Sequence, residues 1–325
     1  MIMKLKWFSC LLVINAIMGG PVSMFTDAYA QGLESSLNWE IEASKKTYYP
    51  GEAVLLTLNI SNTGDQEIEI NFGAEGIEAI ASMEIRNSSG KIVAKGGQIR
   101  RAGVARPGFF TVASGKTSRR PIVLNQWCST RLTPGQYHVA CRVEYRFPSE
   151  RRKLPNTKTP KAGPIHTVEL ELDIQIVSAN SPKLEAILEG LAKRAFKKNP
   201  SVFEEPAVWK KALADRRIAK EMLAFTESTL AVPYQLQVLK NARSTWLEWG
   251  VINSLVKSKS LDAASGLMQI IESPRCREHR KRQAIDAVYR LRETGKSDIV
   301  NATNDFVAKY KRPVIVENMC QYPIL

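Results

Sequence analysis

The spacing of apolar residues changes near Ser178, and this change divides the chain into two parts. Before Ser178, apolar residues mostly alternate in short runs interrupted by Gly and Pro, and after it they recur at helical spacing almost to the end. Alternation is typical of half-buried strands, whereas recurrence every three or four residues is typical of amphipathic helices. We therefore predict a β-sandwich domain over residues 31–178 and an α-helical domain over residues 179–325.

The first 30 residues have the pattern of a signal peptide. Lys4 and Lys6 precede an apolar run over residues 7–18, and a small-x-small sequence ends at Ala30. The apolar run is shorter than the ~20 residues that a membrane span needs. We therefore expect cleavage after Ala30 and an exported chain, periplasmic or extracellular, with no transmembrane segment in the mature protein.

The part before Ser178 contains eight short segments in which apolar residues alternate with polar ones. Turn signals such as Pro50-Gly51 and Pro134-Gly135 separate them. The predicted strands cover residues 38–43, 53–62, 67–72, 82–87, 92–95, 117–124, 137–147 and 167–176. Seven or eight short strands of this kind predict an immunoglobulin-like antiparallel β-sandwich.

Two motifs carry a resemblance to a known family. The run Tyr-Tyr-Pro-Gly-Glu at 48–52, followed by alternating apolar residues from Val54 to Ile60, resembles the opening of immunoglobulin-like domains in bacterial exported proteins. These include the intracellular proteinase inhibitor family of bacilli. The segment from Leu132 to Tyr137 resembles their late corner, in which the tyrosine hydroxyl bonds back to upstream backbone. The resemblance implies the fold, and it permits a secreted proteinase inhibitor as an alternative function.

Such an inhibitor would place an exposed loop in the cleft of a protease. Residues 96–109 and 146–163 are the two candidate loops.

Four cysteines remain once Cys10 leaves with the signal peptide. Cys128 and Cys141 lie in the first part, and Cys276 and Cys320 lie in the second, so each part could hold one disulfide. If Pro134-Gly135 formed a two-residue hairpin, Cys128 and Cys141 would lie opposite each other and could bridge. If the same segment is a corner between sheets, Cys128 lies in the connection. The sequence then does not decide whether Cys128 and Cys141 form a disulfide.

The part after Ser178 contains a series of short amphipathic segments. The predicted helices begin with a helix capped by Ser181 and continue over residues 207–214, 217–226, 233–243, 245–256, 260–271, 280–292 and 297–310. Residues 282–295 resemble a helix of a HEAT-type repeat, and a weaker echo occurs about 36 residues earlier. We predict a HEAT-like solenoid, with an irregular helical bundle as the alternative.

No known catalytic or cofactor-binding motif occurs in the chain. The three histidines are isolated in sequence, and no Cys or His cluster has the spacing of metal ligands. The sequence therefore predicts a non-catalytic protein without cofactor or metal. The alternative is an enzyme whose residues come together only in the folded chain.

Positive charge is concentrated in the helical part, which has 25 basic and 16 acidic residues, against 19 and 15 between residues 31 and 177. Two clusters predict a surface for an anionic partner: Arg275, Arg277, Arg280, Lys281 and Arg282 in the helical part, and Arg151, Arg152 and Lys153 in the first part. The alternative is that the two clusters bind no partner and are simply a solvated helix face and a solvated loop. Export argues against nucleic acid, so a protein partner or an anionic envelope component is expected.

Overall fold

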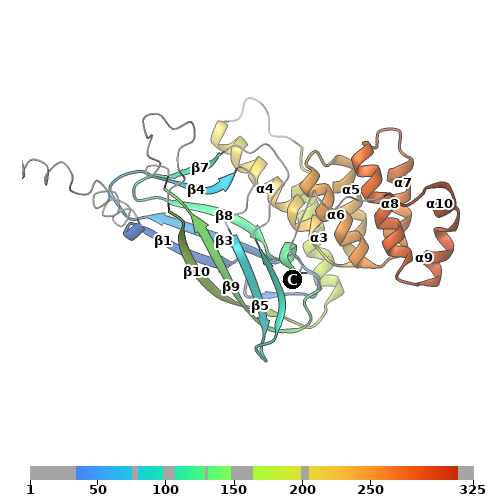
Figure 1. Ribbon diagram of the computed structural model, residues 1–325, viewed down its shortest axis with the longest axis horizontal. Helices are drawn as coiled ribbons and strands as arrows, with labels where there is room; N and C mark the ends of the chain where they lie inside the picture. Colours follow the sequence, from blue (N-terminus) through green and yellow to red (C-terminus); the bar gives the residue numbers. More distant parts are fainter. Residues whose placement is uncertain are drawn as a thin grey trace, which may run out of the picture.

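The computed structural model describes residues 34–74, 80–97, 107–128, 131–147, 164–198 and 205–313. A β region is followed by an α-helical region, which confirms the predicted order of the two classes (Figure 1). The last strand ends at Ile176 and the next helix begins at Ser181, where the apolar spacing changes. The predicted signal peptide lies outside the described residues. Within them, no helix combines the length and the apolar character that a bilayer span requires.

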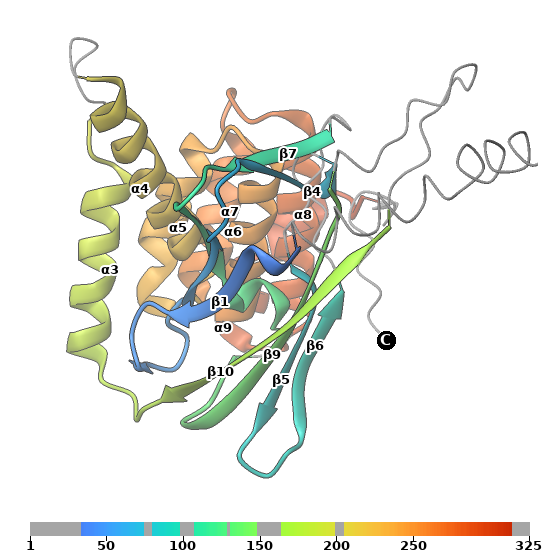
Figure 2. The ribbon, with the colours of Figure 1, turned by 90° about the vertical axis from the view of Figure 1, so that its left-hand side faces the viewer.

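The described residues of the β region form three sheets. Strands β1 (Leu37–Ala43), β3 (Leu55–Asn62) and β8 (Thr117–Val123) form one sheet, and β4 (Ile68–Ala74) pairs with β7 (Pro107–Val112) in another. The largest sheet has the order β2 (Thr47–Tyr48), β10 (His166–Ile176), β9 (Gly135–Tyr145), β5 (Ile80–Asn87) and β6 (Ile92–Gly97), so β6 is its edge strand (Figure 2). All pairs are antiparallel except β2 with β10.

The chain crosses from the three-stranded to the five-stranded sheet between β8 and β9. A 3-10 helix, η1 (Leu124–Trp127), begins this crossing. The hydroxyl of Tyr137 donates a hydrogen bond to the carbonyl of Thr133 at 2.8 Å and accepts one from the Thr133 amide at 3.1 Å. The predicted back-bond of this tyrosine is therefore present, and the segment is a connection between sheets rather than a two-residue hairpin.

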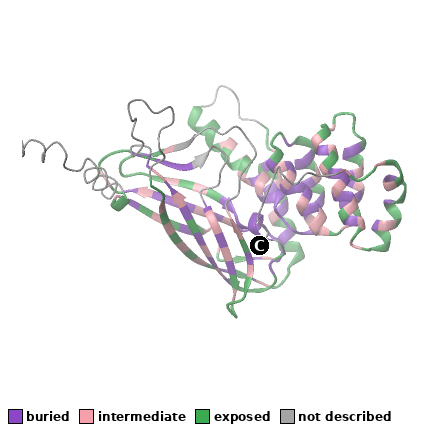
Figure 3. Cartoon of the chain, viewed as in Figure 1, coloured by how far each residue is buried: buried purple, intermediate pink, exposed green. Residues whose placement is uncertain are grey.

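The helical region consists, in the described residues, of eight helices and one further 3-10 helix, η3 (Thr229–Ala231). The helices are α3 (Ser181–Ala195), α4 (Pro206–Ala224), α5 (Val232–Asn241), α6 (Thr245–Ser258), α7 (Leu261–Glu272), α8 (Glu278–Arg292), α9 (Ser297–Ala302) and α10 (Asn304–Lys309). Their apolar faces turn inward, and buried positions form a continuous core that also includes the sheets (Figure 3).

Three helix predictions were wrong in detail. Residues 207–214 and 217–224 belong to the single helix α4, because no Gly or Pro interrupts it, and the helix ends at Ala224 rather than at residue 226. The predicted helix over 297–310 is two helices, which meet at the buried Thr303. The cap of α3 is Asn180, whose Oδ1 accepts a hydrogen bond from the Lys183 amide at 3.1 Å.

The two regions are joined by a set of polar contacts around Glu227. Its amide donates to the carbonyl of Gly51 at 2.8 Å. Its carboxylate is 2.5 Å from the Lys257 ammonium, which also donates to the Cys128 carbonyl at 2.7 Å. Beside these contacts, and within the β region, Arg131 donates a hydrogen bond to the Pro50 carbonyl at 2.6 Å. We call these contacts the junction. Burial raises the pKa of the Glu227 carboxyl, and the charge of Lys257 opposes this shift.

Candidate functional site

The predicted basic cluster on α8 is partly internal. Arg280 is buried, and its guanidinium donates to Glu248 Oε1 at 2.5 Å and to the Ala242 carbonyl at 2.7 Å. Glu248 is fully buried in α6, and His279 Nε2 lies 2.6 Å from its other carboxylate oxygen. Arg280 was therefore wrongly predicted as a surface for a partner. It is a structural residue, because its charge compensates a buried carboxylate.

The other members of that cluster lie closer to solvent, and three of them make contacts with other residues. Arg277 lies 3.9 Å from Glu248 and donates to the Ala242 carbonyl at 3.4 Å. Arg282 pairs with Glu278 at 3.3 Å, and the Lys281 ammonium lies 5.6 Å from the centre of the Tyr310 ring. Arg275 is exposed.

The second predicted cluster, Arg151, Arg152 and Lys153, lies outside the described residues. Most of the two candidate inhibitor loops also falls outside them.

The structure contains Cys128 and Cys141 as free, buried thiols rather than as a disulfide. Cys128 follows η1 in the crossing, whereas Cys141 lies within β9 opposite Met83 and Leu170. Of the two alternatives for this segment, the corner between sheets is present, and the hairpin that would have brought the two cysteines opposite each other is not. Burial raises the pKa of each thiol to about 12. Cys276 is also a free thiol, and Cys320 lies outside the described residues.

A basic site that the sequence analysis did not predict lies where helices α3, α4, α5 and α6 meet. It is a cavity of about 880 Å³, which we call the Lys220 pocket. Its polar lining comes from Lys197, Arg216, Arg217, Lys220, Glu221, Gln237, Asn241, Arg243 and Ser244. Ala195, Phe196, Leu213, Ala242, Trp246 and Leu247 supply the remaining wall. The volume is within the ~300–1,000 Å³ range of ordinary ligand sites.

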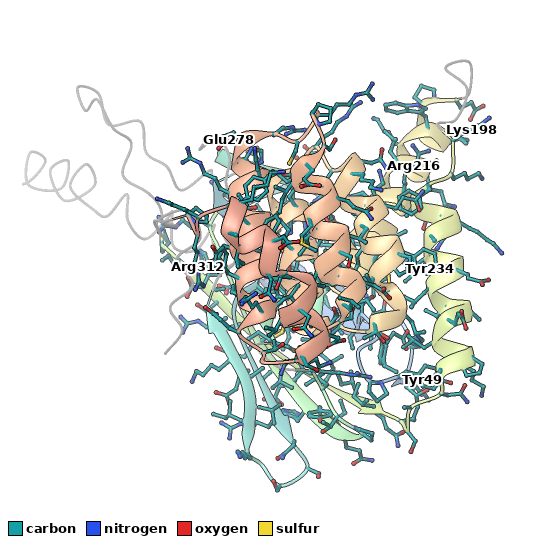
Figure 4. All side chains as sticks on the ribbon, turned by 90° about the vertical axis from the view of Figure 1, so that its right-hand side faces the viewer. Tyr49, Lys198, Arg216, Tyr234, Glu278 and Arg312 are labelled. Atoms are coloured by element: carbon teal, nitrogen blue, oxygen red, sulfur yellow. The ribbon has the colours of Figure 1, made fainter. Side chains whose placement is uncertain are left out.

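The pocket contains more cations than the carboxylate within it can neutralise. Glu221, the one acidic residue in the lining, accepts a hydrogen bond from Arg217 Nε at 3.0 Å. Arg216 donates to the carbonyl of Lys198 at 2.8 Å, which holds it against the segment that follows α3 (Figure 4). Lys220 and Arg243 therefore add positive charge beside Arg216 with no second carboxylate in the lining.

Lys220 is the most informative residue of the pocket. It is half-buried, and in the described part of the chain it forms no hydrogen bond or ion pair. Burial lowers the pKa of its ammonium, and the nearby charges of Arg216 and Arg243 lower the pKa further. An anion placed in the pocket would raise the pKa again through its opposite charge. The arrangement is therefore suited to binding a carboxylate or a similar anion against a partly apolar wall.

Sequence reasoning missed this pocket because its cations come from three separate segments. Arg216 and Lys220 are four residues apart and share a face of α4, and this spacing was visible in the sequence. Arg243 precedes α6, and Lys197 follows α3. No sequence signal indicated that these ends would meet.

Comparison with known proteins assigns no family. No family model and no curated protein matches the chain. Among solved structures, the sporulation control protein Spo0M from Bacillus subtilis aligns at 16% identity over 48% of this chain, with a TM-score of 0.23. A β-glucosidase from Erythrobacter marinus aligns at 12% identity over 44% of this chain and 15% of its own, with a TM-score of 0.22. The chain spans 54% of the length of Spo0M, and TM-scores this low support no shared fold or function.

Proposed function

We propose that the protein is an exported, non-catalytic interaction protein of the bacterial cell envelope, which binds an acidic group of its partner in the Lys220 pocket. The partner is a protein or an anionic envelope component. The finer architecture that we propose is an immunoglobulin-like sandwich followed by HEAT-like helices. The sheet crossing and the Tyr137 bond support the sandwich, and consecutive short helices with inward apolar faces support the array.

The ammonium of Lys220, which is half-buried and has no hydrogen bond or ion pair with any residue that the structure describes, is the observation that carries this proposal. Partial burial of a charge is unfavourable unless a counter-charge or an acceptor compensates it. Arg216 and Arg243 increase the cost, because like charges repel. A bound anion supplies a counter-charge to Lys220, Arg216 and Arg243 together, so it offsets these costs. The apolar wall, which includes Phe196 and Trp246, would contact the less polar part of the partner.

Replacing Lys220 by methionine should reduce the affinity for a hexaglutamate peptide by about tenfold or more, because a charge-assisted hydrogen bond is lost. Methionine keeps the length of the side chain, so the pocket should keep its shape. Isothermal titration calorimetry at low and high salt would measure the change. Lys281→Met, which removes the same charge from α8, is the matched control. Equal losses in the two variants would show a dependence on net charge alone and would contradict the proposal.

The affinity should also depend on pH in a defined direction. Because the pKa of free Lys220 is lowered and a bound anion raises it, binding takes up protons near the lowered pKa. The affinity for the anion is therefore at its maximum below that pKa, and it decreases as the pH rises through it. Lys220→Met should lack this dependence while retaining the weaker contributions of Arg216 and Arg243.

A further inference from the structure

A second cavity lies between the β region and the helical region and has a different chemistry. It has a volume of about 450 Å³, and we call it the junction slot. One wall is the edge strand β6, residues 92–96, and the other is formed by α6 together with Arg290 of α8. Asn125, Gln126, Trp127, Cys128, Phe225 and Glu227 complete the lining. The slot is separate from the Lys220 pocket, since the two share no lining residue.

The walls of the slot are largely apolar and are shaped by two glycines. Ile92 on β6 is 41% exposed, although it is a large aliphatic residue, and Trp249 is half-buried. A Cβ on Gly96 would lie 2.9 Å from the Trp127 ring, and a Cβ on Gly250 would lie 2.7 Å from the Phe225 ring. Both rings therefore pack directly on backbone. This close packing fixes an aromatic surface on each side of the slot.

The charges at the slot leave one cation without an acidic partner. Lys257 is paired with Glu227, and Lys95 lies 3.1 Å from Glu84. Arg290 is exposed, and its hydrogen bond within the described residues goes to the neutral amide oxygen of Asn253, at 3.2 Å. Among the described residues, no carboxylate forms an ion pair with Arg290. A ligand that complements the slot thus has an apolar body and a single negative charge.

We propose that the junction slot binds a small organic acid, whose apolar body lies between Ile92 and Trp249 and whose carboxylate pairs with Arg290. The guanidinium suits this role, because its planar donors match the two oxygens of a carboxylate. The volume of the slot is also within the range usual for small-ligand sites. This binding site is independent of the proposed anion pocket and could exist without it.

The probe for this site is 4-phenylbutyrate, compared with 4-phenylbutanol, which has the same apolar body without the charge. We expect the acid to quench the fluorescence of Trp127 and Trp249 and to bind about tenfold more tightly than the alcohol. Arg290→Ala should abolish this preference and leave the two affinities equal. Arg282→Ala removes an exposed arginine of the same helix and should leave the preference unchanged.

A second variant keeps the proposal testable if Arg290→Ala fails to fold. Ile92→Glu changes an exposed side chain, so it should fold, and it should weaken binding of both probes because it places a charge on the apolar wall. Several results would overturn the proposal: no binding of either probe at millimolar concentration, equal binding of acid and alcohol to the wild-type protein, or a preference that survives Arg290→Ala. Tighter binding of an acetylated Phe-Glu peptide than of 4-phenylbutyrate would also overturn it and would indicate a docking site for a partner chain.

Discussion

Replacing Glu248 by leucine is expected to lower the free energy of unfolding by about 3–5 kcal/mol, because it leaves the buried Arg280 guanidinium without its counter-charge. Glu248 is fully buried in α6 and also contacts His279 of α8. Its loss therefore affects the packing of both helices. Urea denaturation followed by circular dichroism would measure the change. A value of that size is a large fraction of the stability of an ordinary domain.

Two further variants distinguish the loss of the buried Glu248–Arg280 ion pair from the general effect of replacing a glutamate by leucine. Glu278→Leu removes an exposed carboxylate that pairs with Arg282, and it should change the stability by about 1 kcal/mol or less. The double variant Glu248→Leu with Arg280→Met should recover most of the loss, because no unpaired charge is then buried. If Glu248→Leu were as mild as Glu278→Leu, Arg280 would have to reach solvent, and it would return to the candidate partner surface.

The second large effect is expected at the junction, where Gly51→Ala should destabilise the protein by more than about 2 kcal/mol. Gly51 has a φ of +82°, a conformation that costs an L-residue about 1–2 kcal/mol. In addition, an alanine Cβ would lie 2.6 Å from the backbone carbonyl oxygen of Glu227. Because that oxygen belongs to the helical region, relief of the clash must separate the two regions. The measurement is again the free energy of unfolding in urea.

Gly90→Ala is a closely matched control. Gly90 has a φ of +77°, almost the same as Gly51, but a Cβ there would contact nothing within 4 Å. The difference between the two variants therefore isolates the contact across the junction from the backbone cost. Equal destabilisation by the two substitutions would show that the Gly51 to Glu227 contact adds nothing to stability.

The sequence predicted the elements well where local pattern decides them. Alternation in β3 and the apolar spacing of α7 needed no knowledge of tertiary contacts. The prediction missed β7 because its segment, Pro107–Val112, begins with Pro-Gly and has no alternating pattern. It divided α4 at Asp215 and Arg216, whereas these are exposed or half-buried positions of a continuous helix.

The candidate sites were less predictable, since each depends on contacts between distant segments. The run of arginines near α8 suggested a surface, but Arg280 turns inward toward Glu248, which lies 32 residues earlier. Nothing in the local sequence distinguishes Arg280 from the exposed Arg282. The Lys220 pocket was invisible for the opposite reason, because its cations are dispersed in sequence and converge only when α3 to α6 pack together.

Amide hydrogen exchange with and without hexaglutamate tests the central claim most directly. The account predicts slower exchange in the segments that line the Lys220 pocket, residues 194–198, 213–221 and 241–247, with no change over residues 275–282. The same experiment on Lys220→Met should show little protection. Protection confined to residues 275–282, or no protection in the pocket segments under conditions in which the peptide binds, would contradict it.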